Sequence, residues 1–313
     1  MIHAVVVDPA LPERLTVREV EAPVPASNEA LVRGAAISLN RGEVRGAMMS
    51  EAGARPGWDL AGTVERAAAD GSGPREGTRV VGLKPSGAWA EVVAVPTNTL
   101  AELPADVSFA QAATLPVAGL TALLALGKGG NLIERDVLVT GASGGVGLFA
   151  VELARLAGTR VVGAVHQQQH AAVVAERGAY EVVYGERLEP ARAFGPYHLI
   201  LDSVGGASLG TALTLLANQG TCVFFGVSGG AEVTFDAGTF FRTGGTTLYG
   251  LFLFDEVTRG ETASLGLTRL SRLVADDKLH PLIEVEAPWT EIGAVAQRYF
   301  SRGFPGKAVL HIA

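Results

Sequence analysis

The 313-residue sequence contains a single cysteine, Cys222. One thiol cannot form an intrachain disulfide and cannot build a metal site from several thiolates. This usage favours a reducing, cytoplasmic location. The N-terminal segment Met1–Asp8 has neither the basic stretch nor the long apolar run of a signal peptide.

Runs of basic residues are also absent, and the net charge is −7 with a pI near 5.5. An acidic protein of this kind is not expected to bind nucleic acid, although a local basic pocket for a phosphate is compatible with it. No charged residue occurs between Asp106 and Lys128. Polar residues and a proline interrupt that stretch, and no basic residue flanks its N-terminal side, which favours a buried interdomain segment over a membrane span.

What the sequence does contain is apolar surface and glycine. Hydrophobic residues make up 48% of the chain, and the 40 glycines and 15 prolines form no repeat. This is a globular α/β composition, long enough for two packed cores. The expected partner is a small-molecule substrate.

The first third of the chain is typical of short strands separated by turns. Many short strands with frequent turns predict a small barrel. The expected strands are Ala4–Val7, Thr16–Glu19, Glu29–Ile37, Gly62–Ala67, Arg79–Leu83 and Trp89–Val95.

From Phe109 onward, predicted helices and strands alternate. Continuous apolar runs predict strands that are buried on both faces, hence a parallel sheet covered by helices. The expected strands are Val137–Thr140, Arg160–Val165, Glu181–Val183, His198–Asp202, Gly220–Phe225 and Thr246–Phe252. The expected helices are Phe109–Leu115, Thr121–Leu126, Val146–Leu156, Gln168–Arg177 and Ser208–Leu216. The tail (helices Leu267–Asp276 and Glu291–Tyr299, strands Ile283–Glu286 and Ala308–Ile312) is expected to return to the barrel.

The strongest motif is the glycine-rich stretch after the strand that ends at Thr140. Glycines at 141, 144, 145 and 147 allow positive φ angles and a close approach of the backbone to an anion. The helix that follows directs its free N–H groups and positive dipole end at the same place. A strand, a glycine loop and a helix that open a series of β–α units predict a dinucleotide site. The alternative is a tight turn whose glycines serve packing alone.

The strand Arg160–Val165 should end beside the adenine ribose. An NAD site commonly has Asp or Glu there, whereas this chain has His166-Gln-Gln-Gln-His170. Without a carboxylate to repel it, a 2′-phosphate is acceptable, and His166, His170 or the glutamine amides could bond to it. We therefore predict NADPH as the cofactor. The alternative is that these residues only cap the next helix. The segment also has no Arg or Lys to pair with the phosphate.

Several segments together resemble the medium-chain dehydrogenase/reductase superfamily, in its zinc-free quinone oxidoreductase-like branch. They are Ser38–Glu43, Pro56–Gly62, Leu115–Ala122, Gly141–Gly147, Asp202–Gly206 and Gly306–Leu310. The resemblance implies an α/β protein with two domains. A GroES-like β-barrel catalytic domain would comprise residues 1–112 and 266–313, and a Rossmann domain with a doubly wound parallel sheet would comprise residues 113–265.

The resemblance also explains the missing metal ligands. Zinc-dependent members hold their catalytic zinc with Cys, His and Cys, and the matching positions here are Asn40, Trp58 and Val117. Trp and Val cannot ligate zinc, and the four-cysteine structural zinc lobe is missing as well. We expect no zinc, and therefore reduction of a polarised acceptor rather than oxidation of an alcohol.

The residues implied for the site fall into two groups. Asn40 is the expected catalytic residue, positioning substrate or nicotinamide; a role as a turn or cap residue is the alternative. The expected cofactor-binding residues are Thr121, Ser143, Gly144, Gly145, Val146, Gly147, His166, His170, Gly226, Val227, Leu251 and Phe252. Thr121 could instead be a helix N-cap, and Phe252 a core or dimer-contact residue. Arg41 and Met48 depart from the family pattern, which puts a quinone-specific pocket in doubt.

The predicted reaction is NADPH-dependent hydride transfer to an α,β-unsaturated carbonyl or a quinone. The alternatives are an enoyl reductase or tailoring enzyme of a biosynthetic pathway, and a nicotinamide-binding protein without turnover. A homodimer is expected, because the apolar strand Thr246–Phe252 would lie at an open sheet edge.

Overall fold

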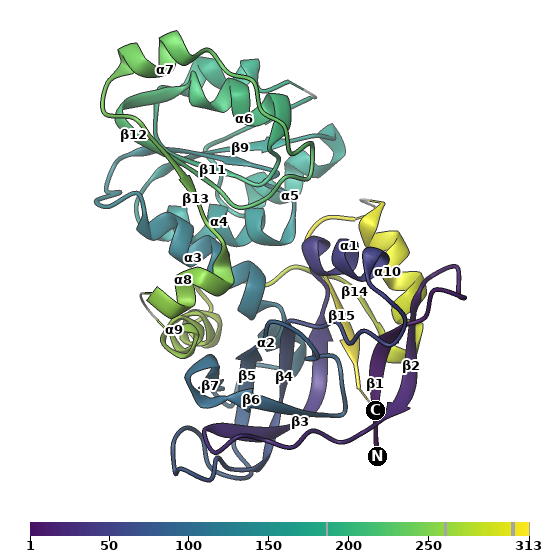
Figure 1. Ribbon diagram of the computed structural model, residues 1–313. Coiled ribbons are helices and arrows are strands. Elements are labelled where there is room, and N and C mark those ends of the chain that lie inside the picture. The colour runs from purple at the N-terminus through teal and green to yellow at the C-terminus, as the bar shows by residue number, and fades with distance from the viewer. Residues whose placement is uncertain (186, 260–261, 302–303, 313) are drawn as a thin grey trace. The chain divides into compact units, whose positions relative to one another are not determined.

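The computed structural model describes residues 1–185, 187–259, 262–301 and 304–312 (Figure 1). The chain forms two compact units, which we describe separately. The first unit comprises Met1–Leu120 with Val257–Ala313, and the second comprises Thr121–Glu256. The domain boundaries predicted from the sequence, at 112/113 and 265/266, fall inside the helices α2 (Phe109–Ala113) and α9 (Ala263–Ala275).

The first unit is built mainly on antiparallel strands, and only β14 and β15 among its described pairs run parallel. Its main sheet has the order β14-β15-β3-β4-β5-β7, with β6 paired to β3, and β1 pairs with β2. The strands are β1 (Ile2–Val7), β2 (Leu15–Val20), β3 (Glu29–Ser38), β4 (Asp59–Arg66), β5 (Arg79–Leu83), β6 (Val92–Pro96), β7 (Leu100–Glu102), β14 (Ile283–Pro288) and β15 (Lys307–His311).

Helices complete the first unit, and its core lies between them and the strands. The helices are α1 (Arg41–Met49), η1 (Thr97–Thr99), α2, the π-helical turn η2 (Leu115–Gly119), α9, η5 (Trp289–Glu291) and α10 (Ile292–Phe300). Trp89 is fully buried in the core, and Gly57 makes room for it. Gly57 has a φ of +118°, and a Cβ there would lie 2.4 Å from the Trp89 amide nitrogen.

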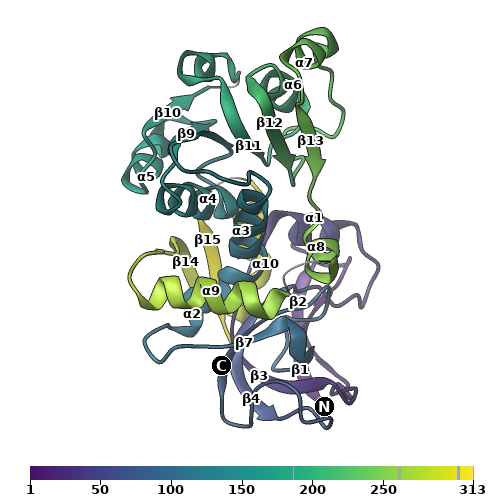
Figure 2. The ribbon, with the colours of Figure 1, turned by 90° about the vertical axis from the view of Figure 1, so that its left-hand side faces the viewer.

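The second unit contains one parallel sheet with the order β10-β9-β8-β11-β12-β13. In Figures 1 and 2, α4 lies on one face of this sheet, and α6 and α7 lie on the other. The strands are β8 (Asp136–Thr140), β9 (Arg160–Val165), β10 (Glu181–Tyr184), β11 (Tyr197–Asp202), β12 (Leu216–Phe224) and β13 (Thr247–Gly250). The helices are α3 (Leu120–Gly127), α4 (Gly145–Leu156), η3 (Gln168–His170), α5 (Ala171–Glu176), η4 (Glu189–Phe194), α6 (Gly206–Leu213), α7 (Ala237–Thr243) and α8 (Leu253–Arg259).

The strand order of the second unit reverses between β8 and β11. From β8 the chain adds β9 and β10 on one side, and from β11 it adds β12 and β13 on the other. In parallel α/β sheets, ligands bind outside the carboxyl ends of the strands at this reversal. The predicted doubly wound sheet is confirmed, and its reversal places the glycine loop at the position where a ligand is expected.

Among the described residues, three α-helices were not predicted from the sequence, namely α1, α7 and α8, and neither were the short helices η1 and η4. Gly42 and Gly46 lower the helix propensity of the α1 segment, so that its sequence resembles a loop. The predicted strand Thr246–Phe252 is shorter in the structure: β13 ends at Gly250, and Leu251 and Phe252 lead into α8.

Candidate functional site

The glycine loop between β8 and α4 has a conformation that only glycine permits at two positions. Gly141 has a φ of +59°, and a Cβ on it would lie 2.4 Å from Ser203 Oγ. A Cβ on Gly147 would lie 2.3 Å from the Gly141 carbonyl oxygen. These glycines therefore let the loop fold tightly against the first turn of α4, which agrees with both the packing and the binding interpretations.

The first turn of α4 agrees with the binding interpretation. Gly144 N donates to Gly141 O, and the first helical bond runs from Leu148 N to Gly144 O. Within the described residues, no acceptor is present for the amides of Gly145, Val146 and Gly147. Free N–H groups at the positive end of a helix dipole bind an anion such as a pyrophosphate. In the loop, Ser143 is half-buried and Gly144 is exposed, so an anion could reach both residues.

Asp202, at the end of β11, organises the turn beside this loop. Its carboxylate accepts from Thr140 Oγ1 at 2.8 Å, and from the amides of Gly205 and Val204 at 2.7 and 3.2 Å. Burial raises the pKa of Asp202, and these hydrogen bonds act in the opposite direction. The carboxylate thereby ties the ends of β8 and β11 together at the strand reversal. The family resemblance includes the segment Asp202–Gly206, but only the structure shows the hydrogen bond from Thr140 to Asp202.

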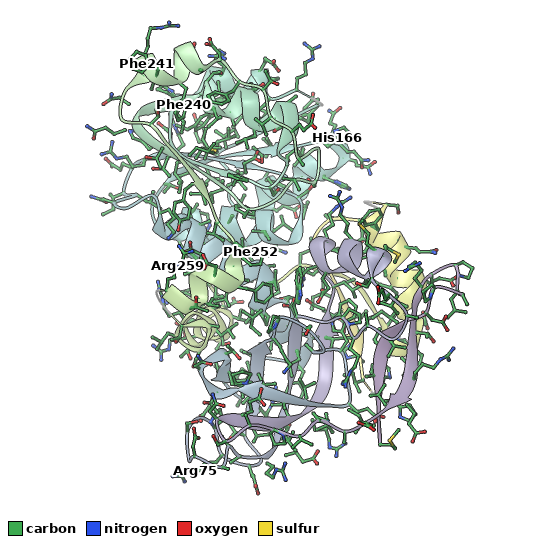
Figure 3. All side chains as sticks on the ribbon, viewed as in Figure 1. Arg75, His166, Phe240, Phe241, Phe252 and Arg259 are labelled. Carbon is green, nitrogen blue, oxygen red and sulfur yellow. The ribbon has the colours of Figure 1, made fainter. Side chains whose placement is uncertain are left out.

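The residues predicted at the ribose end follow β9. His166 is exposed and His170 is half-buried, on the segment that leads through η3 into α5 (Figure 3). Neither Gln167 before η3 nor His170 before α5 makes a side-chain cap. Gln167 and His170 therefore do not cap these helices with their side chains, and Gln167 Oε1 instead accepts from Gln169 Nε2 at 3.0 Å.

Tyr184 is a candidate that the sequence analysis missed. It ends β10 and pairs with Val165, and Gly185 N donates to Val165 O at 3.2 Å. Its side chain is exposed, and the pairing places Tyr184 at the carboxyl end of β10, beside the end of β9 that leads into His166. The parallel pairing of β9 with β10 brings Tyr184 to the carboxyl end of β9. No common sequence motif joins these two segments.

The residues predicted at the nicotinamide end follow β12 and β13, which pair in parallel. A Cβ on Gly226 would lie 2.7 Å from the Ser203 carbonyl oxygen, so the backbone here approaches the Asp202 turn closely. Val227 is partly exposed, and Leu251 is buried with its amide bonded to Phe224 O. The strand ends thus gather these residues at the same edge as the glycine loop.

Phe252 and Thr121 each had a simpler interpretation that the structure excludes. Phe252 is 66% exposed and packs edge-to-face on Phe254, with ring centroids 5.7 Å apart, so it is not a core residue of this chain (Figure 3). Thr121 is buried and is the second residue of α3, which continues directly from η2, so it is not an N-cap.

In the first unit, Asn40 lies in a buried polar network with Glu43, Asp59 and Lys307, which we call the Asn40 network. All four residues are at most 7% exposed. Asn40 Nδ2 donates to Asp59 Oδ2 at 2.7 Å and to Glu43 Oε2 at 3.3 Å. Asn40 Oδ1 accepts from Lys307 Nζ at 2.6 Å, and Lys307 Nζ lies 3.5 Å from Asp59 Oδ2.

Asn40 is also the residue that precedes α1, and Glu43 Oε2 accepts from its backbone amide at 2.9 Å. The alternative role of Asn40 at a helix start is thus present in the structure. The capping box pairs the Asn40 side chain with the Glu43 backbone as well, so the helix start and the network share this side chain.

Burial is the largest cause of the pKa shifts of Glu43 and Lys307. It raises the pKa of Glu43, and the nearby Asp59 charge raises it further. Burial lowers the pKa of Lys307, against the pull of Asp59 and Glu43. The Glu43 carboxyl accepts from the amides of Asn40 and Trp58, which partly offsets its desolvation.

The three positions that match zinc ligands in the family meet around these carboxylates. Asn40 and the Val117 amide donate to Asp59, at 2.7 and 3.0 Å, and the Trp58 amide donates to Glu43. In the described ranges, His, Cys, Asp and Glu side chains form no group of three or more that could hold a metal ion. Among the helices of those ranges, none has the length and apolar character to cross a membrane.

Comparison with protein families agrees with this architecture. Residues 26–105 match the alcohol dehydrogenase GroES-like domain, and residues 145–266 match the zinc-binding dehydrogenase family. These matches, the mainly antiparallel first unit and the parallel sheet of the second unit define a two-domain dehydrogenase of the GroES-like plus Rossmann class.

Individual relatives define the branch. The chain is 30% identical to the chloroplastic quinone-oxidoreductase homolog of Spinacia oleracea, over 88% of this chain and 89% of that protein. It is 28% identical to the quinone oxidoreductase of Sus scrofa, over 93% and 92%. Among solved structures, the Escherichia coli quinone oxidoreductase complexed with NADPH has a TM-score of 0.87 at 25% identity, covering 99% of each chain. The chain belongs to the medium-chain dehydrogenase/reductase superfamily, in its quinone oxidoreductase-like branch.

Proposed function

We propose that this chain is an NADPH-dependent, zinc-independent oxidoreductase that transfers hydride to an α,β-unsaturated carbonyl or a quinone. The observation that carries the proposal is the glycine loop, whose three free amides in α4 lie at the strand reversal. The Escherichia coli and mycobacterial relatives whose structures hold NADPH support the choice of cofactor.

The residues of the second unit suit the parts of a dinucleotide. Ser143, Gly144, Gly145, Val146 and Gly147 would hold the pyrophosphate through backbone amides and the helix dipole. His166, His170 and Tyr184 would bond to the ribose and its 2′-phosphate. The nicotinamide would be lined by Thr121, Gly226, Val227, Leu251 and Phe252.

When bound, reduced nicotinamide supplies the hydride, and a proton from solvent completes the reduction of the acceptor. Asn40 is the side chain proposed to position substrate or nicotinamide. Zinc independence is supported by Trp58 and Val117, which have no metal-binding side chain at the positions matched to zinc ligands.

The direct test measures oxidation of NADPH by purified protein with a panel of enones and quinones. We expect turnover above background without added metal, and no loss after treatment with a zinc chelator. Tight NADPH binding with no turnover on any acceptor would favour a non-catalytic nicotinamide-binding protein. Turnover confined to enoyl thioesters would favour the enoyl reductase alternative. Stoichiometric zinc in the active protein would contradict the metal-free assignment.

Cofactor preference is tested separately by the dissociation constants of NADPH and NADH. We expect tighter NADPH binding for two reasons. No carboxylate directly follows β9, and Tyr184, His166 and His170 lie near the carboxyl end of that strand. Tighter NADH binding would contradict the ribose argument.

We assign the enzyme to the cytoplasm as a homodimer acting on a small molecule. Cys222 is buried, and burial raises its pKa, which suits a thiol that stays reduced. The strand β13 is at the edge of its sheet, with Leu248 exposed, and such an edge can pair with a second copy. Cell fractionation and light scattering test these two assignments.

A further inference from the structure

Two arginines lie on one face of α1, near the end of the helix where a positive charge is least favourable. Arg41 is the first residue of α1, and Arg45 follows it by about one helical turn. Residues four apart are neighbours on the surface of a helix, and two like charges at this spacing repel each other. The positive end of the helix dipole adds to the repulsion. The pair therefore costs local helix stability, and such a cost is typical of functional positions.

Arg41 is held in place by α10, which packs against α1. Its Nη2 donates to the carbonyl oxygen of Phe300 at 3.0 Å, and its guanidinium lies 5.6 Å from the centroid of the Phe300 ring. Phe300 is the last residue of α10, so its carbonyl belongs to the negative end of that helix dipole. These contacts fix a positive charge at the start of α1.

Arg45 differs from Arg41, because no side chain or carbonyl of the described residues holds it. Arg45 is exposed, and within the described ranges it has neither a hydrogen bond nor a carboxylate partner. Arg298, in the last turn of α10, is exposed as well, and its guanidinium lies 5.2 Å from the centroid of the Phe304 ring. The adjoining helices α1 and α10 thus carry three guanidinium groups, in a chain whose net charge is −7.

The carboxylates nearest in sequence do not neutralise this face of α1. Glu43 lies between the two arginines, but residues two apart on a helix do not face each other. Its side chain is buried in the Asn40 network, where it accepts from the Asn40 amide at 2.9 Å. Glu51 follows the end of α1, and no ion pair joins it to an arginine of the described part of the chain. The exposed surface of α1 is therefore positive.

The neighbours of Arg45 place this face beside the proposed substrate position. A Cβ on Gly42 would lie 3.2 Å from Trp58 Cη2, so the indole ring, which matches a zinc-ligand position of the family, lies against α1 at Gly42. Gly42 and Arg45 are three residues apart, on the same side of the helix. Asn40 precedes α1, and Arg45 follows it by about 8 Å along the helix axis. All of these residues belong to the first unit.

We propose that the organic acceptor of this enzyme is an anion, and that Arg45 binds its carboxylate, sulfonate or phosphate group, with the fixed charge of Arg41 one turn away. Guanidinium groups recognise such oxyanions through planar, bidentate hydrogen bonds. A Cβ on Gly46 would meet nothing within 4 Å, so the surface beside Arg45 has room for the anion. The inference rests on the proposed function and names the chemical class of its substrate.

The test compares matched acceptors that differ in charge. One pair is 4-oxopent-2-enoate, an anionic enone, and its neutral methyl ester. The other pair is 1,4-naphthoquinone-2-sulfonate and 1,4-naphthoquinone. The measured quantity is the ratio of kcat/KM for the anionic compound to kcat/KM for the neutral compound. Comparing this ratio between the wild type and a variant cancels the intrinsic reactivities of the two compounds, and either pair that turns over decides.

Arg45→Met should lower this ratio about fivefold, as expected for one partly solvated ion pair. Arg45→Lys should keep most of the ratio, and Arg45→Glu should lower it further than Arg45→Met does. Higher ionic strength should lower the ratio of the wild type more than that of Arg45→Met. Because Arg45 is exposed and has no partner in the described residues, we expect all three variants to fold.

Arg75→Met is the matched control. Arg75 is exposed in the loop before β5, in the same unit but far from α1 (Figures 1 and 3), and its loss changes the net charge by the same amount. This variant should leave the ratio unchanged.

The outcomes separate the inference from the proposed function. An unchanged ratio in Arg45→Met, or an equal loss in Arg75→Met, would overturn the inference alone, because turnover of the neutral acceptors would still establish the function. Absence of turnover with every acceptor would overturn the proposed function, and the inference with it.

Discussion

Gly147 is the residue at which the glycine loop has least room for change. An added Cβ would lie 2.3 Å from Gly141 O and 2.7 Å from Ala142 Cα, and both are backbone atoms. We expect Gly147→Ala to lower the free energy of unfolding by about 1–3 kcal/mol through overpacking. Displacement of the free amides should raise the NADPH dissociation constant about tenfold or more.

The matched control is Gly127→Ala in α3, where a Cβ would meet nothing within 4 Å. We expect it to leave NADPH affinity unchanged. Chemical denaturation and calorimetric titration measure both quantities, and wild-type affinity in Gly147→Ala would contradict the close-approach argument.

Asp202 allows a prediction about pH. Burial raises its pKa above the unfolded value of 3.8. Between pH 3.8 and the raised folded pKa, the folded state binds more protons than the unfolded state. The contribution of Asp202 to stability therefore falls as the pH rises through this range. Asp202→Asn should remove that contribution, so the unfolding free energy should fall less steeply with pH than in the wild type.

Thr140→Val provides the comparison for Asp202. It deletes the Thr140 hydroxyl that donates to the carboxylate at 2.8 Å, which should raise the pKa of Asp202 further and steepen the fall. Denaturation curves over a series of pH values measure the slopes. Equal slopes in all three proteins would contradict the assignment.

Among the secondary-structure elements, α3, β13 and α8 meet at Lys128. Lys128 Nζ donates to Glu256 Oε2 at 2.8 Å and to Tyr249 Oη at 3.1 Å, and Tyr249 donates to Glu256. Tyr249 and Glu256 flank the segment 250–252 that is proposed to line the nicotinamide. The contacts of Lys128 therefore brace that segment from both ends.

We expect Lys128→Met to weaken NADPH binding by about threefold and to cost about 1 kcal/mol of stability, since the ion pair is partly solvated. Lys278→Met is the control, because its pair with Asp276 is exposed on both sides. Calorimetric titration of both variants measures the effect. An equal loss of NADPH affinity in Lys278→Met would mean that the loss of a positive charge alone causes the effect.

Predicting elements from the sequence succeeded where the pattern was local. The strands Arg79–Leu83 and Arg160–Val165 were predicted with the bounds that the structure has, because their apolar runs end at turn residues. Helix α1 was missed, since two glycines conceal a helix that depends on the Glu43 carboxylate and on buried neighbours. Local propensity yields to tertiary packing in such segments.

For the whole molecule, the prediction concerns assembly. Leu248 is 41% exposed in the edge strand β13. If two copies pair along this edge, Leu248→Lys should convert a dimer into a monomer by burying an unpaired charge. The variant should still bind NADPH, because the glycine loop lies at a different part of the sheet.

Light scattering of the wild type and the variant measures the mass. Leu265→Lys, an exposed position on α9, is the control and should leave the mass unchanged. A monomeric wild type, or a Leu248→Lys variant that remains dimeric, would remove this interface.

The sequence by itself determined the class of this protein. Buried strands, the glycine spacing between residues 141 and 147 and the absence of an acid after Val165 are local features, and local features can be inferred from a single chain. Only the tertiary structure decided the surroundings of Asn40. Its partner Lys307 lies 267 positions away, and no periodicity joins residues across such a distance. The pairing of β3 with β15 brings them together, and that pairing decides which way the Asn40 amide lies.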